Sequence, residues 1–214
     1  MSTYIYPISI ILMFLLLYES ITTAYSYAPK KIKVITIMAL FLIVLRYISL
    51  SLLLIYEKMQ YMYLLKPVIF LEIIYIPMII FISVNIFARN DKIKMNFFFI
   101  LCAIFLIVYF IFIIKAPFYT SLSQLYGYSI TLKNGIYPYL VLIIANTISF
   151  AYGFKIFEYK FNDKVGTFLM IVSSIITIGS VIASVFHENF MGMIILGEIF
   201  WVGTLVYGLR KFVK

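Results

Sequence analysis

The sequence predicts an all-α membrane protein, a single domain built as a bundle of seven transmembrane helices. Of its 214 residues, 65% are hydrophobic and only 12% are charged, a far more apolar composition than soluble domains have. The apolar residues form continuous stretches of about 20, the length of helix that crosses a hydrocarbon core. They do not alternate with polar residues, as they would in the strands of a membrane barrel.

Seven such stretches follow one another and leave almost no sequence for a soluble catalytic domain. The helices are predicted at residues 5–27, 34–56, 63–87, 96–115, 136–157, 165–186 and 190–209. The longest connection, about 116–135, is rich in Tyr and Ser. It could form a short hairpin, a re-entrant segment over the mouth of the bundle, or an ordinary flexible loop.

The basic residues predict the orientation of the bundle. Twelve of the 17 Lys and Arg residues lie in or beside the first, third and fifth connections and the C-terminal tail, and four lie on the other side. Because cytoplasmic loops carry an excess of basic residues, the N-terminus is expected outside and the C-terminus in the cytoplasm. The expected location is a bacterial plasma membrane. The basic residues form short clusters and no patch, so the expected partners are the bilayer and a membrane or cytoplasmic protein, not nucleic acid.

Four polar side chains lie within the apolar stretches at similar depth, about nine to eleven residues from the outer end. They are Arg46, Glu72, Asn146 and Glu198. A charged group inside a bilayer is costly and usually has a function or a partner. Arg46 is expected to pair with Glu72 or Glu198, either in a ligand or proton site that opens outward or in an ion pair that only fixes helix packing.

Two further patterns concern helix shape and packing. Pro77 lies within the third stretch and is expected to kink it, which makes this residue a possible hinge. Small residues recur in the last two stretches and should allow these two helices to pack closely. They include Gly179, Ser180, Ala183, Ser184, Gly192, Gly197, Gly203 and Gly208.

No known catalytic or metal-binding motif is present. Cys102 and His187 are the only cysteine and the only histidine, so the common zinc sites have no ligand set. The HExxH, CxxC and phosphate-loop patterns are also missing. No catalytic residue, metal or cofactor is therefore predicted.

Two segments resemble a known family. The first is Phe70-Leu-Glu72-Ile-Ile-Tyr-Ile-Pro77-Met-Ile-Ile-Phe81, which continues to Phe87-Ala-Arg89, and the second is Asn134-Gly135-Ile-Tyr137-Pro138-Tyr139. Both are similar to the seven-helix N-terminal sensor region of bacterial histidine kinases and diguanylate cyclases. No kinase or cyclase domain is present, so the resemblance implies a free-standing sensor, a partner subunit or a sensor fragment.

The leading hypothesis is therefore a sensory or regulatory module that binds a small ligand and signals to a partner. One alternative is a small transporter with a 3+1+3 arrangement of repeats, suggested by the Tyr-Pro pairs that open the first and fifth helices. The other is a non-catalytic accessory subunit of a larger membrane complex. The oligomeric state is not predicted.

Overall fold

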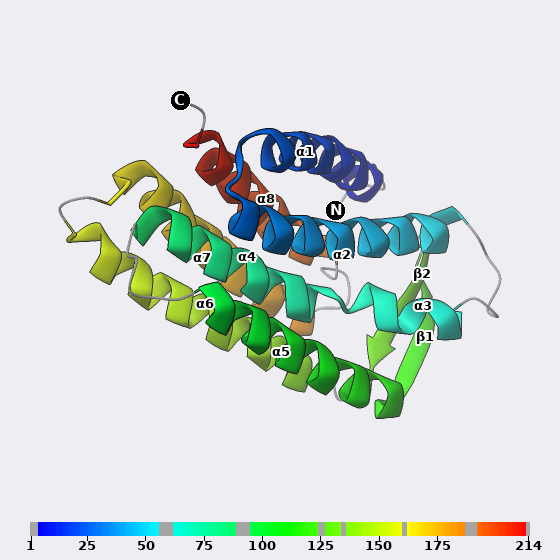
Figure 1. Cartoon of the computed structure of the whole chain (residues 1–214). Coiled ribbons are helices and arrows are strands. Elements are labelled where there is room, and N and C mark those ends of the chain that lie inside the picture. Colours follow the sequence, from blue (N-terminus) through cyan, green and yellow to red (C-terminus); the bar gives the residue numbers. More distant parts are fainter. Residues whose placement is uncertain are drawn as a thin grey trace.

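The chain folds into a helical bundle with one small hairpin (Figure 1). The computed structural model describes residues 4–55, 62–88, 95–123, 127–133, 136–159, 162–186 and 192–212. The helices are α1 (Ile5–Tyr27), α2 (Lys30–Ile55), α3 (Met62–Ile69), α4 (Glu72–Ala88), α5 (Met95–Lys115), α6 (Ile136–Phe157), α7 (Lys164–Phe186) and α8 (Ile194–Arg210). All seven predicted stretches are therefore helical in their described parts, and the third is divided in two.

Five helical segments are long and apolar enough to cross a membrane. They are Ile5–Tyr27, Lys30–Ile55, Leu64–Ala88, Tyr137–Phe157 and Lys164–Phe186. The helix α8 has 17 residues, and α5 contributes a shorter apolar segment, Cys102–Lys115. The class of helical membrane protein is thus supported, and the seven-span topology stays a prediction.

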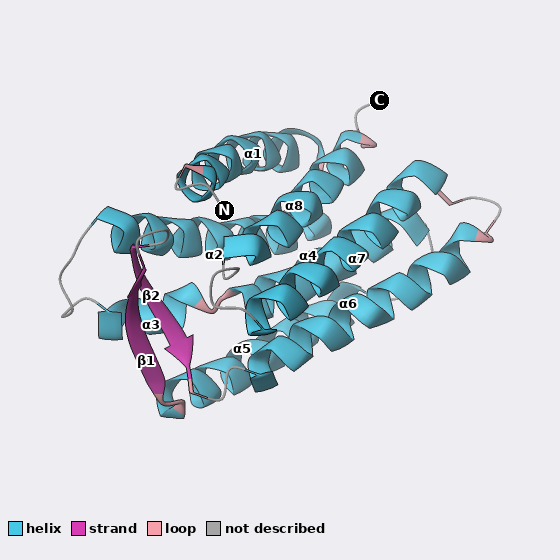
Figure 2. Cartoon of the chain, turned by 180° about the vertical axis from the view of Figure 1, so that it is seen from behind, coloured by secondary structure: helices cyan, strands magenta, loops and turns pink. Residues whose placement is uncertain are grey.

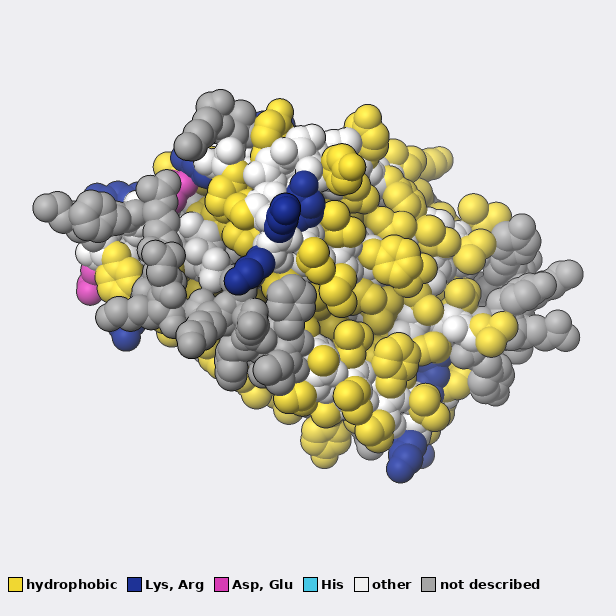
Figure 3. All heavy atoms as spheres, viewed as in Figure 1, with side chains coloured by type: hydrophobic (Ala, Val, Ile, Leu, Met, Phe, Trp, Pro, Cys, Tyr) yellow, Lys and Arg dark blue, Asp and Glu magenta, His cyan; other side chains and the backbone are white. Residues whose placement is uncertain are grey.

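The outer surface of the bundle is apolar. Hydrophobic side chains cover much of the described surface in Figure 3, with scattered Lys, Arg, Asp and Glu side chains among them. On α1 and α5, large aliphatic residues such as Ile11, Leu15, Ile107 and Ile111 are mostly exposed. Contiguous apolar surface of this extent is unfavourable in water and is expected where lipid covers it.

The divided third span is the central element. The helix α4 packs against α2, α5, α6, α7 and α8, and α1 packs against α2 and α8. In an apolar 18-residue window of the Leu64–Ala88 segment 83% of the residues are buried, against 22–39% in the corresponding windows of the other four candidate spans. Polar side chains on α4 therefore face protein rather than lipid.

A two-residue turn at Phe70 and Leu71 separates α3 from α4. Pro77 lies within α4, which remains helical from Glu72 to Ala88, so the interruption comes before this proline. At the turn, the Ile73 amide donates to the Phe70 carbonyl at 3.2 Å. A regular helix would instead use the Ile69 carbonyl, which is left free for another donor.

The long connection forms an antiparallel hairpin at one end of the bundle, next to α3 (Figure 2). Strand β1 (Phe118–Ser123) pairs with β2 (Gly127–Leu132) in the register Phe118↔Leu132 to Ser123↔Gly127. The side chains of Ile130 and Leu132 are buried. The hairpin alternative is therefore confirmed, and this end is called the hairpin end below.

The expected close packing of α7 and α8 is found at only some of the small residues. A Cβ atom added to Gly197 would lie 2.9 Å from the Cα of Thr177, so the two backbones nearly touch there. At Gly179 and Gly203 an added Cβ atom would meet nothing within 4 Å. Spacing alone did not distinguish the glycines at the helix contact from those facing away.

Candidate functional site

Arg46 lies on α2 inside the bundle and is held by four protein groups. Its Nε donates to the Ile69 carbonyl at 2.6 Å, the oxygen released by the turn between α3 and α4. One Nη1 hydrogen bond goes to the Tyr75 hydroxyl at 2.7 Å. The same Nη1 also pairs with Glu198, and Nη2 pairs with Glu72. The guanidinium thus donates hydrogen bonds to the free carbonyl of the interrupted helix and to both carboxyl groups.

The two carboxyl groups come from different helices. Glu72 is the first residue of α4, and Glu198 lies on α8. The Tyr47 hydroxyl donates to the second oxygen of Glu198 at 2.6 Å. We name Arg46, Tyr47, Glu72, Tyr75 and Glu198 the Arg46 cluster. Because its members belong to α2, α4 and α8, the cluster connects three helices that are far apart in the sequence.

The cluster is almost completely withdrawn from solvent. Arg46 is 5% exposed, and Glu72 and Glu198 are each 1% exposed. The guanidinium carbon also lies 5.9 Å from the ring centre of Tyr47 and 6.0 Å from that of Tyr75, within cation–π range. Burial of ions costs several kcal/mol each, so the cluster depends on its full set of hydrogen bonds.

A pocket leads from the hairpin end to this cluster. Its empty volume is about 590 Å³, including the open space at its mouth, and both Arg46 and Glu72 line it. The other lining residues are Tyr6, Leu50, Leu53, Ile69, Phe70, Ser129, Ile130, Tyr139, Gly192, Ile194 and Ile195. A mainly apolar wall with a few convergent polar groups is the usual character of a small-molecule site.

Asn146 does not join the cluster. Its Oδ1 accepts a hydrogen bond from Trp201 Nε1 at 2.9 Å, and its Nδ2 donates to the Leu142 carbonyl at 2.8 Å. Trp201 is fully buried. The sequence indicated correctly that Asn146 is a polar residue within a span, but it did not indicate which neighbour the side chain contacts.

The two tyrosines of the cluster were missed at the level of sequence, although a signal was present. Tyr47 follows Arg46 directly, and Tyr75 lies three residues after Glu72, a spacing that puts two side chains on one helix face. Buried ions need donors and acceptors on every side, and tyrosine hydroxyl groups nearby can supply them.

The opposite end of α8 carries a second set of ionic contacts. Arg210 pairs with Glu19 of α1, and Lys211 Nζ lies 3.1 Å from Asp163 Oδ2 in the connection before α7. Hydrogen bonds to Tyr207 and Asp163 raise the pKa of Lys211. Glu19 thus belongs to this end of the bundle and not to the Arg46 cluster.

Within the described part of the chain, no group of three or more His, Cys, Asp or Glu residues could hold a metal ion. The structure is thus a helical bundle with five helices long and apolar enough to cross a membrane, and with a buried ion-pair cluster at the base of a pocket. The chain matches no known protein family, and no curated protein matches it.

Proposed function

We propose that this protein is a membrane sensory or regulatory module that binds a small ligand in the pocket and signals to a membrane or cytoplasmic partner. The observation that carries the proposal is the position of the Arg46 cluster. It forms the base of the pocket and holds α2, α4 and α8 together. A ligand that changes the pairing of Arg46 would therefore change how these helices pack.

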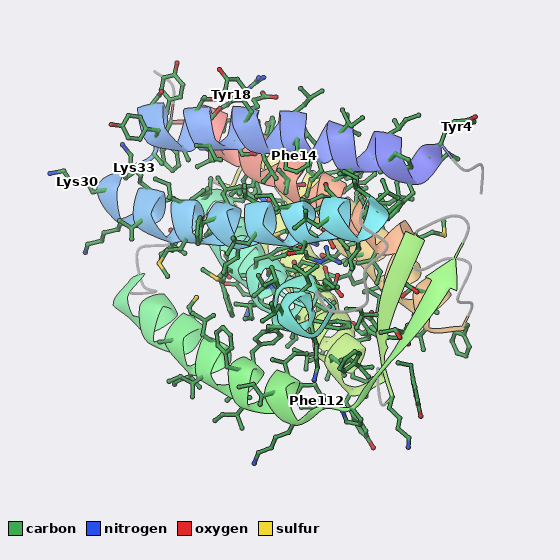
Figure 4. All side chains as sticks on the ribbon, turned by 90° about the vertical axis from the view of Figure 1, so that its right-hand side faces the viewer. Tyr4, Phe14, Tyr18, Lys30, Lys33 and Phe112 are labelled. Atoms are coloured by element: carbon green, nitrogen blue, oxygen red, sulfur yellow. The ribbon has the colours of Figure 1, made fainter. Side chains whose placement is uncertain are left out.

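The helix α8 supplies the path for the signal. It carries Glu198, which pairs with Arg46 in the cluster, and Arg210 in its last turn, which pairs with Glu19. The proposed topology has seven spans, with the hairpin end outside. Figure 4 is consistent with this orientation, because Lys30 and Lys33 lie at the opposite end of the α1–α2 pair from Tyr4.

The proposal is tested by filling the pocket and observing the far end of α8. Leu53 lines the pocket, so Leu53→Trp should occupy part of it. Hydrogen–deuterium exchange of the full chain in lipid nanodiscs would then be followed at residues 204–212. We expect changed exchange there, and no change with the control Ile107→Trp on the exposed face of α5. An effect confined to the hairpin end would refute the signalling role.

The partner is sought by purifying the tagged chain from native membranes in mild detergent and identifying the proteins that accompany it. A signalling module should bring a stoichiometric partner, and Leu53→Trp should change the amount recovered. A partner whose recovery does not depend on the pocket would instead support a non-catalytic accessory subunit.

One observation favours a transporter as the second candidate. Helix contacts among the first three spans are repeated among the last three: α1 with α2 as α6 with α7, and α2 with α4 as α7 with α8. The pair α1–α8 likewise matches α6–α4. A transporter would expose its central site to both sides in turn. A cysteine at Ser83, buried in α4, should then react with an impermeant thiol reagent added on the cytoplasmic side, whereas a sensor should protect it.

A further inference from the structure

The charges of the Arg46 cluster do not balance. One guanidinium faces two carboxyl groups, so the cluster carries a net charge of −1 when both are ionised. Both oxygens of Glu198 have donors, one from Arg46 and one from Tyr47. A buried charge without compensation is strongly unfavourable, so an additional positive charge is required at this place.

Glu72 is the carboxyl group where that charge can be added. It lines the pocket, whereas Glu198 is not among the lining residues. Arg46 Nη2 pairs with Oε2 of Glu72. Glu72 and Glu198 pair with the same guanidinium, so their like charges repel when both are ionised.

Arg46 has little capacity left for an anionic ligand. Its Nε and Nη1 hydrogen atoms are directed to Ile69, Tyr75 and Glu198, and Nη2 already serves Glu72. A carboxylate or phosphate would therefore find few free donors and would lie beside two carboxyl groups. The aromatic walls, Phe70 and Tyr139, are suited to a cation instead.

We propose that the pocket binds a small organic cation, with an ammonium group paired to Glu72 and an apolar part against the aliphatic wall that includes Leu53. This inference rests on the proposed ligand-binding function and names the chemical class of the ligand. A proton on one carboxyl group balances the cluster while the pocket is empty.

The experiment uses a cysteine in the pocket as a reporter. Because Cys102 is the only native cysteine, Cys102→Ser combined with Leu53→Cys gives one thiol at the pocket wall. Its rate of modification by a neutral methanethiosulfonate is measured with phenethylamine as the probe. Two controls keep the same ring without the positive charge, 2-phenylethanol and phenylacetate.

We expect phenethylamine to protect the thiol far better than either control. In Glu72→Gln the concentration needed for protection should rise about tenfold or more, the value of a charge-assisted hydrogen bond. Glu72→Asp keeps the charge and should retain more of the protection. Glu19→Gln removes a carboxylate at the opposite end of the bundle and should leave the protection unchanged.

Equal protection in Glu72→Gln would overturn the inference, and so would failure of phenethylamine to protect a thiol that still reacts. If Glu72→Gln does not fold, a second measurement on the chain with Cys102→Ser and Leu53→Cys alone tests the inference. A trimethylammonium-ethyl reagent should then react faster than a sulfonatoethyl reagent, each relative to its rate with a free thiol, and the reverse order would overturn the inference.

The two proposals fail in different ways. Protection by phenylacetate or phenylethanol alone would keep the pocket as a ligand site and remove only the cationic class. Unchanged hydrogen–deuterium exchange at the end of α8 in Leu53→Trp would refute the signalling role and would leave the proposal of a bound cation unaffected.

Discussion

Gly197→Ala should destabilise the protein because it adds a methyl group where α7 and α8 are closest. The new Cβ atom would lie 2.7 Å from Thr177 Oγ1 and 2.9 Å from Thr177 Cα. A side-chain hydroxyl could rotate away, but a Cα atom moves only with its helix. The substitution therefore separates α7 from α8 or strains both helices.

The magnitude follows from two opposing effects. Overpacking a close contact costs about 1–3 kcal/mol, and a backbone contact belongs near the upper value. Alanine in place of glycine in a helix interior gains about 1 kcal/mol. The net loss at Gly197 should be about 2 kcal/mol. At Gly203, where an added Cβ atom meets nothing within 4 Å, only the gain should remain.

Gly203→Ala is thus a matched control on the same helix. The difference in stability is measured by heating both variants in the same detergent and determining the folded fraction at each temperature by size-exclusion chromatography. With about 2–4 °C per kcal/mol for a chain of this size, the two midpoints should differ by roughly 6–12 °C. A Gly197→Ala variant as stable as Gly203→Ala would refute the inferred contact between backbones.

Two further predictions concern the polar groups inside the bundle. Arg46→Ala leaves Glu72 and Glu198 without their cation and should cost about 3–5 kcal/mol; the combination of Arg46→Gln, Glu72→Gln and Glu198→Gln should recover most of this loss in thermal unfolding, and no recovery would contradict the ion-pair interpretation. Asn146→Leu removes the acceptor of the Trp201 indole and should cost about 1–3 kcal/mol. Since Trp201 is the only tryptophan, its fluorescence emission should shift to shorter wavelength, and unchanged emission would argue against this hydrogen bond.

The sequence predicted the helices well because a long apolar stretch has few other structures available in a membrane. It also predicted that Arg46 would pair with a glutamate, since the spans offer it few other partners. It did not predict a pair with both Glu72 and Glu198. Depth can be counted along a helix, but the direction of a side chain around the helix depends on how the helices pack. The same limit applied to Asn146, which faces Trp201.

The interruption of the third span shows a second limit. Both Pro67 and Pro77 weaken the helix, and the sequence indicated a kink at Pro77. The turn lies between them, at Phe70 and Leu71. Here Arg46, from another helix, donates a hydrogen bond to the freed Ile69 carbonyl. A tertiary partner thus determines where the helix breaks. Whether Pro77 acts as a hinge stays a prediction.

The Ile69 carbonyl is one acceptor with two potential donors. At present Arg46 Nε occupies it, while the Ile73 amide, its regular helical partner, is bonded to Phe70. A peptide oxygen inside a membrane protein cannot stay unpaired without large cost. If a ligand that competes for Glu72 displaced Arg46, closure of the helix through Ile73 would be the nearest way to satisfy that oxygen. Loss of one bond would then lengthen a helix, and a change at the pocket would become a change in backbone structure at the centre of the bundle.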